Sequence, residues 1–180
     1  MTRCRFWRIF DGMDENVFIY QRDDYSCGPA CLATVSLIFG KETDYEFFRQ
    51  LLTPNPESGT RNSQLAAAAA AHLGAVAHGE DIYRGGIAIA NIIHEPSEDG
   101  HYVVFLDKRD EEIAYYDPYD HEIHIRKQDD IRWVSESGHL EKWSVNFPPL
   151  EGADFALWKS LQEKVHRQPK LIHKQPAAQS

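Results

Sequence analysis

The stretch QRDDYSCGPACLATVSLIF places a cysteine, Cys27, at the start of a long apolar segment. Gly28 and Pro29 follow it, and proline is tolerated in the first turn of a helix because its missing N–H would have no partner there. The unpaired N–H groups and the dipole of a helix N-terminus stabilise an anion and therefore favour a thiolate. Cys27 is either a nucleophile or a small buried hydrophobic residue, since free cysteines are common in protein cores.

Two groups near Cys27 are placed to stabilise the oxyanion that forms when a thiolate attacks a carbonyl carbon. One is the backbone N–H of Cys27 itself, and the other is the side-chain amide of Gln21, six residues earlier. Gly28 is expected to let a substrate backbone approach closely, because glycine has no Cβ atom. This chemistry still requires a base.

The segment GHYVVFLDKRDEEIAYYDP supplies a base and a group that orients it. The runs YVVFL and IAYY flank the charged stretch DKRDEE, which predicts a β-hairpin. If Arg109 is its midpoint, Phe105 pairs with Ile113. The same register pairs His101 with Asp117 on one face of the sheet, with Cβ atoms about 4.5 to 5.5 Å apart. We therefore expect these two side chains to touch, whereas a slip of one residue would send them to opposite faces.

The sequence also allows another interpretation of this pair and another candidate base. A surface histidine and a turn aspartate before Pro118 are the alternative interpretation of His101 and Asp117. His94 is the main alternative base, seven residues before His101. Because HEPSEDG contains a proline and a glycine and is rich in charge, we expect His94 to lie in a loop at the edge of the site.

No metal or cofactor is expected. Cys31 lies four residues after Cys27 and on the same side of a helix, but a zinc site needs two further ligands at matching spacing. Cys31 is therefore assigned to the core. His121 and His124 in DHEIH would face opposite ways on a strand, and we expect both to be exposed.

Helices are predicted in the first half of the chain and strands in the second. The predicted helices run from about Cys27, capped by Ser26, to Gly40, from the capping box Thr43-x-x-Glu46 to Leu52, and from Asn62 or Ser63 to Gly74. Residues 17–20 are a short strand or extended lead-in, and the later strands are AVAH, IAIANII, YVVFL, IAYYD, HEIHI and WSVNF. This separation predicts an α+β fold with an antiparallel sheet.

Two parts of the chain are distinguished. Residues 1–152 are expected to form one domain, because a chain of 180 residues suits a single core. In residues 153–180, the pattern of Phe155, Trp158, Leu161 and Val165 predicts an amphipathic helix, followed by a basic tail expected to be disordered. We expect this region to be able to dock a partner.

Composition excludes several classes of partner and compartment. The net charge of −9 argues against nucleic-acid binding, which needs a basic face. Three cysteines make a disulfide framework improbable and suit a reducing compartment. The N-terminus lacks the apolar segment of a secretory signal, and no apolar stretch approaches the roughly 18 to 20 residues needed to cross a bilayer. The expected location is the cytoplasm, without membrane insertion.

The segments DYSCGPACLATVSLIFG, SGTRNSQLAAAAAAHLG, GHYVVFLD and YYDP occur in this order, with Gln21 before the cysteine. Together they resemble the bacteriocin-processing, double-glycine leader peptidase family and its free-standing relatives, over roughly residues 15–147. The resemblance implies a papain-like cysteine peptidase fold, with N-terminal helices packed on a C-terminal antiparallel sheet. It also implies a peptide or protein substrate with a Gly-Gly cleavage site.

The resemblance assigns a role to each of the four residues. Cys27 is the nucleophile, His101 the general base and then acid, Asp117 the group that orients the imidazole, and Gln21 part of the oxyanion hole. Amide cleavage would pass through a thioester acyl-enzyme. Two alternatives stay open: a non-catalytic peptide-binding module of the same fold, and an amidase, deamidase or acyl transferase that uses the same residues.

Overall fold

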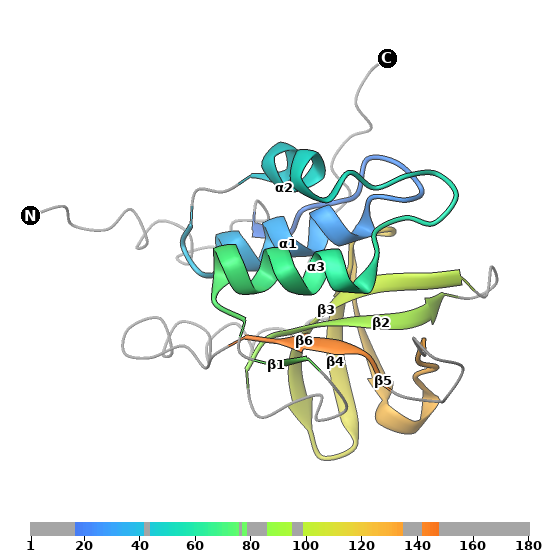
Figure 1. Cartoon of the computed structure of the whole chain (residues 1–180). Coiled ribbons are helices and arrows are strands. Elements are labelled where there is room, and N and C mark those ends of the chain that lie inside the picture. Colours follow the sequence, from blue (N-terminus) through green and yellow to red (C-terminus); the bar gives the residue numbers. More distant parts are fainter. Residues whose placement is uncertain are drawn as a thin grey trace, which may run out of the picture.

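The computed structural model describes residues 17–41, 44–75, 77–78, 86–94, 99–134 and 142–147. The three α-helices come first along the chain and lie together on one side of the sheet (Figure 1). The helical elements are α1 (Cys27–Ile38), α2 (Tyr45–Leu52), α3 (Asn62–Ala68), the π-helical segment η3 (Ala69–Leu73) and the 3-10 segment η4 (Gln128–Asp130). The strands are β1 (Ala77–His78), β2 (Ala88–His94), β3 (Asp99–Arg109), β4 (Glu112–Asp117), β5 (Glu122–Lys127) and β6 (Ser144–Asn146).

α1 is the central helix because it is apolar on all sides. Every one of its residues except Leu37 is buried, and it packs against α2 and β3. A helix that is hydrophobic all round is stable only when other elements surround it. Gly40 has the positive φ of 63° that closes the helix, as predicted. The burial of the whole helix therefore determines where its first residue, Cys27, lies.

Two predicted helix caps were wrong. Ser26 precedes α1, but its ψ of 25° is not extended and its side chain makes no cap hydrogen bond. Its hydroxyl instead accepts a hydrogen bond from the Tyr45 hydroxyl at 2.7 Å. In α2 the cap is Asp44, whose carboxylate accepts from the backbone N–H of Phe47 at 2.9 Å. Thr43 lies outside the described residues.

The other two helices pack through part of their predicted apolar surface. In α2, Phe48 and Leu52 are buried, whereas Phe47 and Leu51 are 41% and 45% exposed. α3 begins at Asn62 without a side-chain cap, continues through η3, and ends at Gly74, where φ is 71°. The predicted end of this third helix is therefore confirmed.

The sheet contains six strands in the order β1-β6-β2-β3-β4-β5, and all neighbours are antiparallel. Each apolar run predicted to be a strand in the second half of the chain contributes one. Residues 17–20 form no strand, but Val17 and Phe18 are buried in the core. The α+β fold with helices packed on an antiparallel sheet is thereby confirmed.

The β3–β4 hairpin has a different register from the predicted one. Its strands continue through the charged residues to a two-residue turn in which Asp110 has φ 52°. Farther from the turn, a bulge between Phe105 and Asp107 shifts the pairing. Phe105 therefore pairs with Tyr115 instead of Ile113. Beyond the bulge, between Phe105 and Asp117, the error is two residues, which is an even number and therefore leaves His101 and Asp117 on their predicted face.

Buried apolar side chains occur on both faces of the sheet. The larger cluster lies between the sheet and the helices, where Leu32, Phe48 and Tyr116 are fully buried. A smaller cluster on the other face includes Phe105 and Trp133. Trp143 belongs to the larger cluster and Trp133 to the smaller one. The strands that carry site residues are therefore packed on both faces by apolar side chains.

Cys4 and residues 153–180, with the predicted amphipathic helix and tail, lie outside the described residues. None of the helices in the described part of the chain has the length and apolar character that crossing a bilayer requires.

Candidate active site

Cys27 is the first residue of α1 and is 6% exposed. A helix N-terminus carries unpaired N–H groups and the positive end of the helix dipole, which stabilise a nearby anion. Gly28 does not serve the role predicted for it, because a Cβ there would lie 2.7 Å from Thr60 Oγ1 and 2.9 Å from Thr60 Cβ. Glycine is needed so that the segment containing Thr60 can pack against α1.

His101 and Asp117 are in contact, as the hairpin pattern predicted. His101 Nε2 lies 2.7 Å from Asp117 Oδ1, and both side chains are buried. Cys27 is close enough to His101 for its side chain to raise the pKa of the imidazole. Because Nε2 is engaged with Asp117, Nδ1 is the ring atom left for the sulfur. The imidazole therefore links the carboxylate of the β4 end to the thiol of the α1 start.

The electrostatics of the pair favour its charged form. Burial alone would lower the pKa of His101, but hydrogen bonds with Asp117 and Cys27 outweigh it and raise that pKa to about 10. Burial would raise the pKa of Asp117, yet the hydrogen bond with His101 lowers it overall. An imidazolium between two anionic partners is the arrangement that a thiolate–imidazolium pair requires.

Gln21 lies beside this site with one amide hydrogen already engaged. Its Nε2 donates to the carbonyl of Asp23 at 2.9 Å, and its backbone N–H donates to the carbonyl of Pro118 at 2.9 Å. The latter bond ties the residue to the turn after Asp117. Its Oε1 is buried without a hydrogen-bond partner among the described residues. The amide keeps a second N–H, so Gln21 can still donate to an oxyanion.

His94 lies elsewhere than predicted. It is the last residue of β2, paired with Asp99, and not part of a loop. Its Nδ1 is 3.8 Å from Asp117 Oδ2, and its ring centroid is 4.9 Å from that of His101. The charged composition of the next residues suggested a loop, but the ladder with β3 extends the strand to His94. The sequence did not indicate that two histidines flank Asp117.

Tyr119 also belongs to the site, although no sequence pattern pointed to it. Its backbone N–H donates to Asp117 Oδ1 at 2.8 Å, and its ring centroid is 5.0 Å from that of His94. The side chain is 53% exposed. Tyr119 therefore orients the carboxylate through its backbone and covers the histidines through its ring.

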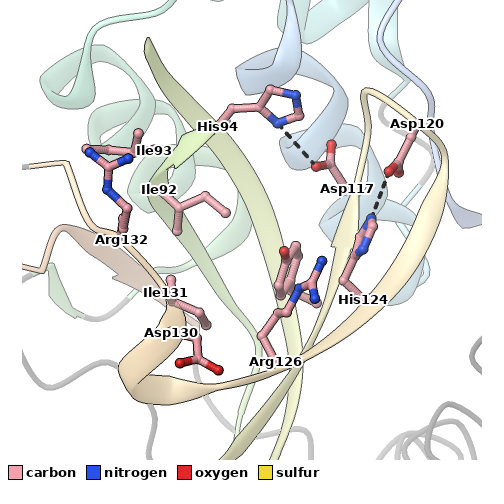
Figure 2. A pocket seen from close by; sticks show the side chains of 11 residues that line it. Ile92, Ile93, His94, Asp117, Asp120, His124, Arg126, Asp130, Ile131 and Arg132 are labelled. Atoms are coloured by element: carbon pink, nitrogen blue, oxygen red, sulfur yellow. Dashed lines mark hydrogen bonds and ion pairs between the residues drawn. The ribbon is translucent and has the colours of Figure 1, made fainter. Parts of the chain in front are cut away.

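Two cavities meet at this cluster. One, of about 290 Å³, is lined by Gln21, Asp24, His94, Asp99, Gly100, His101 and Tyr119. A second, of about 450 Å³, is bordered by His94, Asp117, Asp120 and His124 at one end and by Arg126 and Asp130 at the other (Figure 2). His94 lines both cavities, so it lies on the boundary between them.

The remaining candidates are accounted for by local contacts. Cys31 is fully buried and its thiol donates to the Tyr102 carbonyl at 3.3 Å, which confirms its place in the core. The expectation that His121 and His124 are exposed was wrong. His121 contacts the Tyr116 hydroxyl at 2.8 Å, and His124 Nε2 contacts Asp120 Oδ2 at 2.8 Å. Both rings are half-buried because β5 begins only after His121.

The two aspartates near Cys27 in sequence, Asp23 and Asp24, differ in their surroundings. Asp23 accepts a hydrogen bond from Arg49 at 3.0 Å, and Asp24 is exposed. Asp23 is partly buried in its ion pair with α2.

Comparison with known proteins identifies the family. The peptidase C39 family model matches residues 15–132, more than half of the chain. The chain belongs to the peptidase C39 family. This C39 protein is similar in fold to the peptidase domain of Streptococcus ComA, described as a bifunctional ABC transporter involved in a quorum-sensing pathway. The two share 21% sequence identity with a TM-score of 0.56, over 72% of this chain and 94% of the ComA domain.

A comparison with curated proteins finds no match to this C39 protein. The family match nevertheless confirms the resemblance to double-glycine peptidases, and the ComA domain confirms the papain-like fold. Family membership also supports a cysteine peptidase-like function with a peptide or protein substrate.

Proposed function

We propose that this C39 protein hydrolyses peptide bonds with Cys27 as nucleophile, His101 as general base and acid, and Asp117 as the group that orients His101. The observation that carries the proposal is the position of the His101 ring, which hydrogen-bonds to Asp117 at 2.7 Å and lies close enough to Cys27 for that side chain to raise its pKa. A structural histidine would not need a thiol at a helix N-terminus as its second partner.

The chemistry follows from these positions. The Cys27 thiolate attacks the carbonyl carbon of the scissile amide, and the negative charge moves to the carbonyl oxygen. The backbone N–H of Cys27 and the second amide hydrogen of Gln21 stabilise this oxyanion. The intermediate collapses as the imidazolium of His101 protonates the leaving amine, which leaves a thioester on Cys27. Water, deprotonated by His101, then hydrolyses the thioester and restores the thiolate.

For the substrate we propose a peptide that is cleaved after a Gly-Gly pair, on the basis of the family relationship. ComA, whose peptidase domain has the same fold, is described as acting in quorum sensing, which suits a peptide substrate. We also propose that the sequence around Phe155 and Trp158 docks a partner, because its apolar residues recur at helical spacing.

Incubation with three substrate sets tests the function: peptides containing Gly-Gly, the same peptides with the second glycine replaced by valine, and glutamine side-chain amides. Mass spectrometry should detect cleavage after Gly-Gly by the natural chain and by Cys31→Ala, the matched thiol control on the same helix. Cys27→Ala should cleave nothing. Ammonia release from glutamine without peptide cleavage would favour a deamidase, and binding without any turnover would favour the peptide-binding module.

A further inference from the structure

Three metal-ligating side chains meet at the boundary between the two cavities. His94 comes from the end of β2, His101 from the start of β3 and Asp117 from the end of β4. One ligand atom from each lies within 4.8 Å of the other two. Figure 2 shows the His94 ring and the Asp117 carboxylate facing each other across the edge of the larger cavity. The sheet therefore gathers two imidazoles and one carboxylate at a single point.

The surroundings favour a cation there. Of the described residues that line the smaller cavity, Asp24 and Asp99 carry carboxylates, and none is a lysine or an arginine. The two carboxylates attract a cation, whereas a protonated His101, which lines the same cavity, repels it until its proton leaves. The larger cavity does contain Arg126 and Arg132, but neither arginine lines the smaller cavity. The smaller cavity is thus the route by which a cation would reach the histidines.

Two hydrogen bonds fix the orientation of the Asp117 carboxylate. Asp117 Oδ1 accepts hydrogen bonds from His101 Nε2 at 2.7 Å and from the backbone N–H of Tyr119 at 2.8 Å. These contacts turn Oδ2 toward His94 Nδ1, 3.8 Å away. Metal ligands are commonly held in orientation by such outer hydrogen bonds. A carboxylate with one fixed oxygen and one directed at an imidazole is prepared to bind a cation.

We propose that His94, His101 and Asp117 form a binding site for a divalent cation such as Zn²⁺, which inhibits the enzyme when it binds. Two imidazoles and a carboxylate are a ligand set that zinc accepts, with its fourth position open to water. Ligand atoms at about 2.0 to 2.1 Å from a tetrahedral ion are about 3.4 Å apart. The distances from His101 Nε2 to Asp117 Oδ1 and from His94 Nδ1 to Asp117 Oδ2, 2.7 and 3.8 Å, lie on either side of this value, and the half-buried His94 ring can move toward the other two.

Inhibition follows from the atom of His101 to which the ion binds. Coordination by Nε2 of His101 replaces the proton between that nitrogen and Asp117, and the proton leaves to solvent. With the ion on Nε2, the ring keeps only the Nδ1 proton and cannot form the imidazolium that protonates the leaving amine. This consequence rests on the proposed peptidase function, whereas the metal site itself does not.

A neighbouring cluster is a weaker candidate for the same ion. Asp117, Asp120 and His124 also place ligand atoms within 4.8 Å of one another. This cluster has only one imidazole, and its Nε2 is already 2.8 Å from Asp120 Oδ2. Asp120 is also exposed, so its carboxylate is well solvated without a metal. His124 therefore provides a matched control for His94.

Calorimetric titration of Zn²⁺ into the Cys27→Ala chain tests the site, because this variant removes the thiolate that would bind zinc independently. We expect one ion per chain. Adding His94→Gln should weaken binding at least about tenfold, the range seen when a metal site loses a supporting group. Adding His124→Gln should leave the affinity within about twofold. His94→Ala is a second variant with the same expected loss, and thermal unfolding checks that each variant is folded.

No zinc binding by Cys27→Ala would overturn the proposal, as would equal affinity in the His94 variants or loss of binding in His124→Gln. Inhibition of peptide cleavage is measured separately, with chains that keep Cys27. The zinc concentration for half-inhibition, relative to each chain's own uninhibited rate, should rise about tenfold in His94→Gln. A chain that binds zinc through His94 but cleaves no peptide would refute the proposed function and leave the metal site standing.

Discussion

Asp117 connects most of the candidate site through two oxygen atoms. Oδ1 holds the imidazole of His101 and the backbone N–H of Tyr119, while Oδ2 faces His94. Because the carboxylate is almost fully buried, it has little water to replace a lost partner. The orientation of His101 therefore depends on this one side chain.

We expect iodoacetamide to alkylate Cys27 faster at pH 6 than it alkylates a free thiol at that pH. The reason is that His101, positively charged there, stabilises the thiolate, and the thiolate is the reactive form. His101→Ala should slow this labelling at least about tenfold. Labelling rates measured by mass spectrometry from pH 5 to pH 9 give the comparison. Cys31 is the internal control, since it is fully buried and should react only after unfolding.

The start of α1 is where the helical layer and the site meet. The helix is positioned by its own burial, and the segment before α3 packs against its first turn. Thr60 fills the space that a side chain at position 28 would need. The hydroxyl of Tyr102 on β3 donates to the Thr60 carbonyl at 3.0 Å, so this segment is also tied to the sheet. The segment that contains Thr60 therefore contacts both the helix that begins at Cys27 and the strand that carries His101.

Gly28→Ala should destabilise the protein by about 1 to 3 kcal/mol, because the new Cβ would overlap Thr60 at a site where backbone and side chain are both buried. Chemical denaturation gives the free energy of unfolding. The double variant Gly28→Ala/Thr60→Ala should lose less than the sum of the two single variants, since the second change removes the atom in closest contact. Additive losses would show that steric overlap is not the cause.

At the scale of the whole molecule, the charged pair links stability to pH. The pKa of His101 is raised from 6.5 to about 10 on folding. A group of this kind stabilises the fold fully below its unfolded pKa, and the contribution is lost as the pH rises through the folded value. The pKa of Asp117 is lowered, so its contribution is present above its unfolded value, near pH 4, and is lost at lower pH.

We therefore expect the free energy of unfolding to fall between about pH 6.5 and pH 10, by at most about 1.4 kcal/mol per pH unit. His101→Gln should flatten this part of the profile, because the residue that binds the extra proton is gone. Urea denaturation across the pH range measures the effect. His124→Gln is the matched control, since the pKa of His124 is also raised, by its hydrogen bond with Asp120. A slope that survives His101→Gln would assign the effect to another group.

The amino-acid sequence determined the elements and most of the proposed machinery. An all-apolar segment becomes a buried helix, and short β-branched runs become strands, because burial and local backbone preference act within a few residues. The contact between His101 and Asp117 was predicted despite a register error of two residues. Side-chain direction alternates with period two along a strand, so an even error preserves the face.

Only the tertiary structure decided how distant segments meet. The bulge after Phe105, the packing of Thr60 on Gly28 and the approach of His94 to Asp117 depend on chain closure between segments many residues apart. Composition near His94 indicated a loop, yet pairing with β3 satisfies its backbone groups and extends the strand. Local patterns carry no information on such pairing geometry. The second histidine beside Asp117, and with it the proposed metal site, therefore became visible only in three dimensions.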